Sequence, residues 1–365
     1  MPNPLFQSIL GQPYAVSVLQ TALDDGRLAG SYLFVGPDGV GKATTARQFA
    51  NALCGAASEE DPLARAIDAG TSPDVRRVEP QGAGRMIRIG QLWPRDGDKD
   101  NPPDNAMLRD LAFEPIMGRK RVFILKDAEG LNESSGNSLL KTLEEPPPYA
   151  HFILTATSTA AVLPTIASRC QIVRFGVLPT ADIEGALVER FNVAPAQARF
   201  LSVYSEGRLG RAVALARSPS LLAGRDLLLD FARDLVTAPP IKSFKLGEEF
   251  RKLAPKLRVM DEDVGEGGGG DGDDKPARAS LLRALDLLAT YYRDLLAIRL
   301  LGEKRAHPVN ADRFMELAGA AERYVPAQLE EALALLLALR RAVERNANAQ
   351  LAIEVLFTRL TTLTE

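Results

Sequence analysis

Short apolar runs alternate with longer segments of mixed polarity in the first half of the chain. Residues 32–35 (YLFV), 121–125 (RVFIL) and 152–157 (FILTAT) have the character of buried strands, and residues 172–175 supply a fourth candidate. Helical segments separate these runs, and the helix ending in LLKTLEE stops at Pro146, which cannot continue it. This alternation predicts a mostly parallel sheet covered on both faces, an α/β domain over residues 1–178.

The rest of the chain shows helical spacing and no clear strand. Residues 179–256 predict a small helical domain, and residues 280–365 predict a second one whose amphipathic helices form either an internal core or an oligomerisation surface. Between them, residues 257–279 contain DEDVGEGGGGDGDDKP, which lacks the apolar and aromatic side chains that a core needs. We interpret this acidic, glycine-rich segment as a flexible linker, with an acidic tether or DNA mimic as the alternative.

Composition narrows the class of protein. A chain of 365 residues is expected to form two or three domains, and 46% apolar with 25% charged residues is ordinary for a globular protein. A net charge of −3 creates no field that would draw the whole molecule onto nucleic acid or a membrane surface. No segment predicts a membrane helix or signal peptide, and two cysteines exclude a disulfide framework. We expect a cytoplasmic protein without membrane contact.

A glycine-rich segment follows the first predicted strand and precedes a helical pattern. Residues 36–42 read GPDGVGK, which matches G-x-x-x-x-G-K in the context that this phosphate-binding motif requires. Glycines let backbone N–H groups converge on phosphate oxygens, and the helix N-terminus adds a favourable dipole. The motif predicts a phosphate cradle whose candidate contacts are Gly36, Gly39, Gly41, Lys42 and Thr44.

Both side chains that should hold a magnesium ion in such a centre are missing. The position after the lysine should carry a hydroxyl, yet it is Ala43, and the next side chain along the helix is turned away by about 100°. The strand at 121–125 should end in an acidic pair, yet Lys126 takes the metal-facing position and only Asp127 remains, in the place of the general base. We therefore expect no Mg²⁺ and no hydrolysis. The intact glycines and Lys42 leave ATP binding without hydrolysis open.

Four segments together resemble the bacterial clamp-loader subunits of the AAA+ family. They are residues 6–42 with the glycine-rich loop, NSLLKTLEEPP at 137–147, FILTATSTAAVLPTIASRC at 152–170, and ERNANAQLAIEVLFTRL at 344–360. The resemblance implies a RecA-like AAA+ domain at 1–178, a helical lid at 179–256 and a helical collar at 280–365. Within the family, gamma/tau motors keep a threonine and an Asp-Glu pair for Mg²⁺. Delta-prime members of the family lack these metal ligands, and Ala43 and Lys126 make this chain resemble that branch.

The resemblance also implies roles for individual residues. Arg169, within the Ser-Arg-Cys motif, corresponds to an arginine finger that reaches the γ-phosphate of ATP on a neighbouring subunit. Arginine suits this task because its charge is permanent and its donors form a fixed fork. Thr157, in the segment that resembles sensor 1, is a further candidate nucleotide contact. Cys170 is interpreted as a small buried residue, because no base is close to it in the sequence.

Two features depart from the motor subunits of the family. Gly210 stands where the sensor-2 arginine would be, and we interpret Arg208 and Arg211 as solvated charges, with replacement of the sensor arginine as the alternative. Many relatives also carry a zinc module after the glycine-loop helix. A structural zinc site needs four ligands, and here only Cys54 remains, so no zinc is expected.

Together these features imply a subunit that completes a pentameric ring without hydrolysing ATP itself. The implied partners are gamma/tau and delta clamp-loader subunits, the sliding clamp, and primer–template DNA contacted through the assembled complex. The cluster GRKR at 118–121 is interpreted as a solvated face rather than a DNA-binding surface. Two alternatives stay open: a gamma/tau-like motor that hydrolyses ATP, and a structural AAA+ adaptor in another complex.

Overall fold

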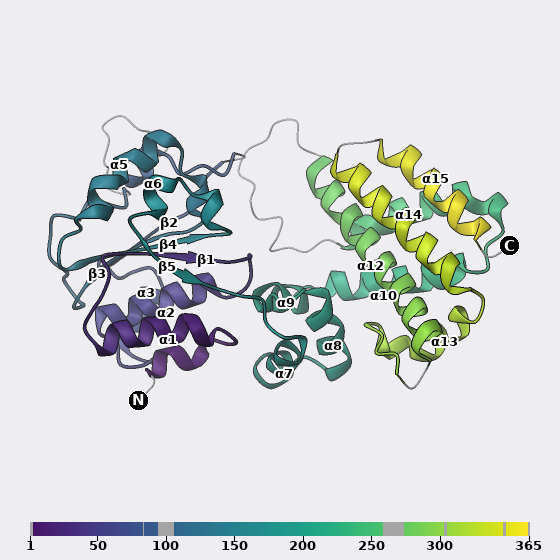
Figure 1. The fold of residues 1–365 in the computed structure, drawn as a ribbon, viewed down its shortest axis with the longest axis horizontal. Helices are drawn as coiled ribbons and strands as arrows, with labels where there is room; N and C mark the ends of the chain where they lie inside the picture. Colours follow the sequence, from purple (N-terminus) through teal and green to yellow (C-terminus); the bar gives the residue numbers. More distant parts are fainter. Residues whose placement is uncertain are drawn as a thin grey trace. The chain divides into compact units, whose positions relative to one another are not determined.

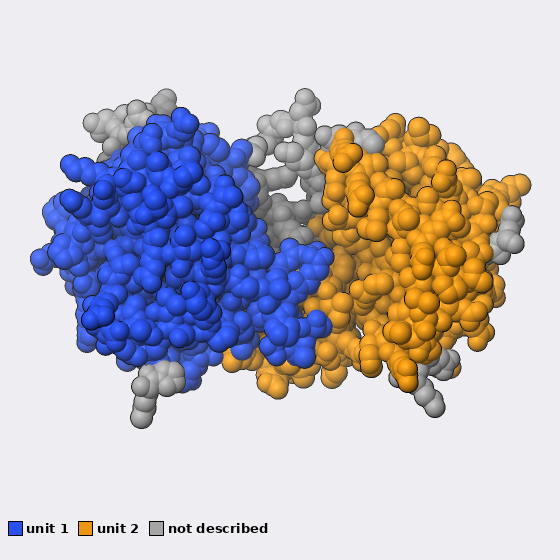
Figure 2. Space-filling view, in the orientation of Figure 1, with its two compact units in different colours: residues 1–183, 206–211, 266–268 blue, residues 184–205, 212–265, 269–365 orange. Residues whose placement is uncertain are grey.

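The computed structural model describes residues 3–82, 84–93, 106–257, 274–302, 305–345 and 348–363. These residues form two compact units, which Figure 2 shows in different colours. The first contains the described residues up to 183 together with 206–211, and the second contains 184–205, 212–257 and the described residues from 274 onward. Helices α7 (Thr180–Phe191) and α9 (Leu209–Ala216) each begin in the first unit and end in the second. Residues of the predicted lid are therefore divided between the units.

A five-stranded sheet forms the centre of the first unit, in the order β2-β3-β4-β1-β5 with every neighbouring pair parallel. The strands are β1 (Ser31–Val35), β2 (Val75–Val78), β3 (Arg121–Leu125), β4 (Ala150–Ala156) and β5 (Gln171–Arg174). Val35 is in register with Ala156 and Arg174, so the strands end at a common edge. The sequence predicts four of these strands and misses β2, whose charged VRRV sequence suits an edge strand.

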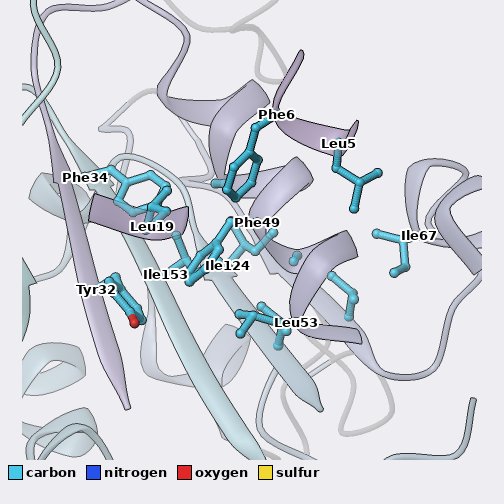
Figure 3. Packing of buried hydrophobic residues seen from close by; sticks show 14 of the residues in the cluster. Leu5, Phe6, Leu19, Tyr32, Phe34, Phe49, Leu53, Ile67, Ile124 and Ile153 are labelled. Atoms are coloured by element: carbon cyan, nitrogen blue, oxygen red, sulfur yellow. The ribbon is translucent and has the colours of Figure 1, made fainter. Parts of the chain in front are cut away.

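Alternate strand residues point to opposite faces of the sheet, and each face is covered by helices (Figure 1). Helices α1 (Pro13–Asp24), α2 (Lys42–Cys54) and α3 (Pro62–Asp68) pack on one face, where Phe34 and Ile124 meet Phe49 of α2, as Figure 3 shows. Helices α4 (Ile89–Leu92), α5 (Glu133–Glu144) and α6 (Pro164–Ala167) cover the other. Leu33 and Phe123 lie in that second cluster. The predicted α/β domain is confirmed.

A buried ion pair organises the loop that leads into β3. Asp74 is fully buried, and its carboxylate accepts backbone N–H bonds from Ile116, Met117 and Gly118 at 2.6–2.8 Å. The Arg121 guanidinium, only 1% exposed, lies 3.5 Å from the same carboxylate. The prediction that the whole GRKR cluster is a solvated face is therefore wrong for Arg121, because its charge is satisfied inside the protein.

The second unit is helical. Its helices, apart from the ends of α7 and α9, are α8 (Pro195–Tyr204), α10 (Pro219–Leu235), α11 (Ser243–Leu253), α12 (Asp274–Leu301), α13 (Phe314–Ala321), α14 (Pro326–Glu344) and α15 (Ala349–Thr362). Phe231, Phe250 and Phe357 join α10, α11 and α15 through ring contacts of 5.2–5.9 Å between centroids. Across both units, 3₁₀ turns form η1 (Pro4–Ser8), η3 (Ala128–Gly130), η4 (Thr159–Ala161), η5 (Pro240–Lys242), η6 (Ala254–Leu257) and η7 (Ala311–Arg313).

One buried arginine links three segments of the second unit. Arg225 of α10 forms a bidentate pair with Asp312, at 2.6 and 2.9 Å, and donates twice to the Asn310 side chain. Its guanidinium lies 4.4 Å from the centre of the Phe200 ring of α8. These contacts hold α8 and α10 against the loop that precedes α13.

The predicted linker falls largely outside the described residues. Helix α12 begins at Asp274, within the segment predicted as linker, and the acidic glycine run before it is not among the residues described. No helix in the described part of the chain has the length and apolar character needed to cross a membrane.

Candidate functional site

The glycine-rich loop joins β1 to α2 at the edge where the parallel strands end. Gly39 and Gly41 have φ values of +79° and +104°, which side chains other than glycine rarely adopt. Gly36 lies against β5, and a Cβ atom there would come within 2.4 Å of the Phe175 carbonyl oxygen. The loop therefore needs glycine at these three positions. This is the geometry that a phosphate cradle requires.

Lys42, the first residue of α2, is buried and folded back onto this loop. Its ammonium group donates to the carbonyl oxygens of Gly36 and Pro37, the latter at 2.9 Å, and lies 3.3 Å from Asp38 Oδ1. An anion in the cradle must exchange with these contacts. The Asp38 side chain is 73% exposed, so its charge is strongly screened by water.

The two positions that lack metal ligands lie together in space. Ala43 and Lys126 line one cavity of about 310 Å³ at the ends of the strands, and Thr44 lines it as well. The Lys126 ammonium is 3.2 Å from Glu79 Oε2. A methyl group and an ammonium group cannot coordinate Mg²⁺, so these two positions supply no ligand for the ion. Among the described residues, no three His, Cys, Asp or Glu side chains are placed to hold a metal ion.

Asp127, in the place of the general base, is held by an arginine. Arg85 Nη2 lies 2.6 Å from Asp127 Oδ2, and both residues have left-handed backbones, with φ of +46° and +51°. The Asp127 N–H donates to Thr155 Oγ1 at 3.1 Å, which fixes the turn after β3. Burial raises the pKa of the Asp127 carboxyl, against the opposing effect of Lys126 and Arg85. This ion pair engages one of the two carboxylate oxygens at the position of the general base.

The residues at the two predicted sensor positions, Thr157 and Gly210, do not have the arrangement expected of a complete ATPase centre. Thr155 lines the cavity, whereas Thr157 lies beyond the end of β4, is exposed, and donates its N–H to Glu129 Oε1 at 3.3 Å. Gly210 of α9 donates its N–H to the Gly39 carbonyl at 2.7 Å, and a Cβ atom at 210 would lie 3.0 Å from that oxygen. Close contact with the glycine-rich loop therefore explains why position 210 carries no side chain. Arg208 and Arg211, interpreted from the sequence as solvated charges, both pair with Glu206.

Arg169 lies between α6 and β5, away from the cavity-lining residues. Its Nε is 3.2 Å from Glu144 Oε2, and its Nη1 donates to the Thr165 carbonyl at 3.0 Å. The side chain is 31% exposed and Glu144 is 59% exposed, so the ion pair lies at the surface. Burial raises the pKa of the neighbouring Cys170 thiol to about 12, which keeps it protonated and a poor nucleophile.

Four charged residues near the cavity were not predicted from the sequence. Arg47, Arg77 and Glu79 line the cavity, and Arg85 pairs with Asp127. Arg47 follows Ala43 by four residues and so shares its helix face, a signal that the sequence does contain. Arg77 lies within β2, and Glu79 and Arg85 follow this strand, which the sequence pattern did not reveal.

The chain is similar to several subunits of DNA polymerase III. The family described as "DNA polymerase III, delta subunit" matches residues 11–179. The DNA polymerase III subunit delta' of Bacillus subtilis is 24% identical over 93% of this chain and 93% of its own length. The gamma/tau subunit of Mycobacterium tuberculosis is 34% identical, but that match spans 50% of this chain and only 30% of the relative. A gamma-subunit-related protein of Thermotoga maritima aligns over 95% of this chain and 99% of its own at 17% identity, with a TM-score of 0.43.

Proposed function

We propose that this chain serves as the delta' subunit of a clamp loader, because a DNA polymerase III delta-subunit family matches residues 11–179 and a delta' subunit is 24% identical along 93% of the chain. In this role it completes a pentameric ring with gamma/tau and delta subunits and helps to load the sliding clamp at primer–template junctions. It does not hydrolyse ATP itself. Helices of the second unit supply the collar through which the ring is held together.

One observation carries this proposal: Ala43 and Lys126 line the same cavity. A motor subunit needs a hydroxyl and a carboxylate that converge on one magnesium ion. Here both ligand positions face a common space, and neither side chain can bind a cation. The Arg85–Asp127 ion pair supports the same conclusion, because Asp127 stands in the place of the general base. These contacts argue against the gamma/tau-like motor.

The proposed active contribution is Arg169, acting on ATP held by a neighbouring subunit. Its ion pair with Glu144 lies at the surface, and such pairs contribute only about 0–1 kcal/mol. Exchange of the Glu144 carboxylate for a γ-phosphate therefore costs little. The planar guanidinium can then stabilise charge that develops on the phosphate during hydrolysis.

Substitution of Arg169 tests this role in a loader reconstituted with its partner subunits. Arginine fingers accelerate nucleotide hydrolysis by about 10³–10⁵-fold, so Arg169→Ala should silence the one neighbouring site and remove its share of total turnover. Arg169→Lys keeps the charge without the fork of donors and should not restore the rate. Steady-state ATPase assays in the presence of clamp and primed DNA measure the effect.

Assembly must be checked in the same preparations. Size-exclusion chromatography should show a complete ring for Arg169→Ala. Arg27→Ala is a matched control, since Arg27 is an exposed arginine of the first unit that precedes β1 and lies outside the Ser-Arg-Cys motif. An assembled Arg169→Ala loader with the turnover of the Arg27→Ala loader would refute the finger assignment.

A further inference from the structure

The cavity between α2 and the strand ends is lined by more positive than negative side chains. Arg47 comes from α2, Arg77 from β2 and Lys126 from the end of β3, whereas Glu79 is the one carboxylate among the described lining residues. Three separate elements therefore direct cationic groups to one space of about 310 Å³. A cavity with this charge favours anions over metal ions.

The existing partners of these cations leave them able to bind a ligand. Lys126 and Glu79 are 43% and 61% exposed, and their 3.2 Å ion pair is open to solvent. Arg47 Nη1 is 3.4 Å from Asp68, and Arg77 Nη2 donates to the Ile67 carbonyl at 2.8 Å. A guanidinium has five N–H donors, so each arginine retains donors beyond these contacts.

We propose that this cavity binds the phosphates of a nucleotide without a divalent cation, with the Lys126 ammonium supplying the positive charge that Mg²⁺ supplies in a complete centre. The cradle formed by the glycine-rich loop and the cavity share the start of α2, so phosphates in the cradle extend towards Ala43 and Lys126. The inference goes beyond the proposed function, which says nothing of ATP binding by this chain, and it does not depend on Arg169.

The charge balance predicts a preference that ordinary phosphate-loop proteins do not have. Free ATP carries more negative charge than its magnesium complex, and the ion in that complex finds no oxygen ligand at Ala43 and meets an ammonium group at 126. Free ATP should therefore bind more tightly than the magnesium complex. Asp38 opposes binding because its carboxylate competes for Lys42.

Isothermal titration calorimetry of the full chain tests the inference directly. ATP should bind in EDTA, excess MgCl₂ should weaken the binding, and inorganic pyrophosphate should compete with ATP. Loss of one charge-assisted contact in Lys126→Ala should weaken ATP binding by about ten- to a hundredfold. Asp38→Asn should strengthen it, and Lys252→Ala, at an exposed lysine of α11, should leave it unchanged.

Several results would overturn the inference. These are the absence of ATP binding with and without Mg²⁺, binding that requires Mg²⁺, failure of pyrophosphate to compete, or unchanged affinity in Lys126→Ala. Lys126→Gln, which removes the charge but keeps most of the side chain, guards against a folding defect. Neither Arg169 nor a neighbouring subunit enters this experiment, so its failure is distinct from failure of the Arg169→Ala assay.

Discussion

Two side chains decide the electrostatics of the candidate site. Ala43 removes one oxygen ligand for a cation, whereas Lys126 places a positive charge where a complete centre has a negative one. The second change has the larger effect, because like charges repel at close range and a missing ligand can be replaced by water. Arg85 then engages the Asp127 carboxylate at 2.6 Å. Under the proposed function, these three residues from three segments account together for the loss of metal binding and of general-base chemistry.

The buried His151 of β4 should make the stability of the first unit depend on pH. Its Nδ1 donates to the Ala29 carbonyl at 2.9 Å, and burial lowers its pKa from the ordinary value of 6.5. The unfolded chain therefore takes up a proton before the folded protein does. The free energy of unfolding should fall as the pH drops below about 6.5, and this fall should end once the pH passes the folded-state pKa.

Urea titrations at a series of pH values measure this effect. Fluorescence of Trp93 reports on the first unit, because it is the single tryptophan and packs against the core there. His151→Asn should flatten the fall between neutral and acidic pH, and His307→Asn, at the exposed histidine, should retain it. An equal slope in His151→Asn and the unchanged protein would contradict the prediction.

The sequence predicts some residues of the candidate site and not others, because only some of their positions follow from local pattern. Ala43 and Lys126 lie at fixed distances from a glycine motif and a buried strand, so their backbone positions follow from local pattern. Arg85 reaches Asp127 only through the fold of a loop 42 residues earlier in the chain. Which threonine of β4 faces the cavity depends on strand register, and the structure places Thr155 there.

Among the elements, the start of α9 is unusually close to the glycine-rich loop. The Gly210 N–H bonds to the Gly39 carbonyl at 2.7 Å, and both residues belong to the first unit. A sensor-2 side chain at 210 would need the loop backbone to move, since its Cβ atom would lie 3.0 Å from that oxygen. The close packing of α9 on the loop therefore disfavours any side chain at position 210.

Gly210→Ala should destabilise the first unit for this reason. Overpacking of this kind typically costs about 1–3 kcal/mol of unfolding free energy. Gly176→Ala is the matched control, because this glycine also belongs to the first unit and a Cβ atom there meets nothing within 4 Å, so alanine should leave the unfolding free energy unchanged or raise it by about 0.4–1 kcal/mol. Urea unfolding followed by Trp93 fluorescence compares them. Equal stability of the two variants would show that the loop yields without cost.

The elements that the sequence predicts best are those with continuous apolar character. The strands now seen as β1, β3 and β4 have every residue buried, and their hydrophobic runs identify them without further information. Strand β2 has two arginines at its centre and lies at the edge of the sheet, where one side has no strand neighbour. Its pairing with β3 is a tertiary contact that local pattern cannot supply.

At the scale of the whole molecule, the proposed tasks divide between the two units. The first unit contains both the cavity and Arg169. The proposed binding of ATP by this chain and the proposed action of Arg169 on a neighbour's ATP therefore both depend on the sheet and its loops. The second is helical and contains the buried Arg225 network, which gives it its own internal organisation. This division suits a subunit whose assembly surface and arginine finger are separate features of the chain.

The rate of ATP hydrolysis by the purified chain alone, measured across a range of Mg²⁺ concentrations, tests the central claim most directly. The missing metal ligands predict turnover no higher than that of Lys42→Ala at every concentration, even where ATP itself binds. Turnover that rises with Mg²⁺ and disappears in Lys42→Ala would contradict the account, because it would require a magnesium-binding site that Ala43 and Lys126 cannot form.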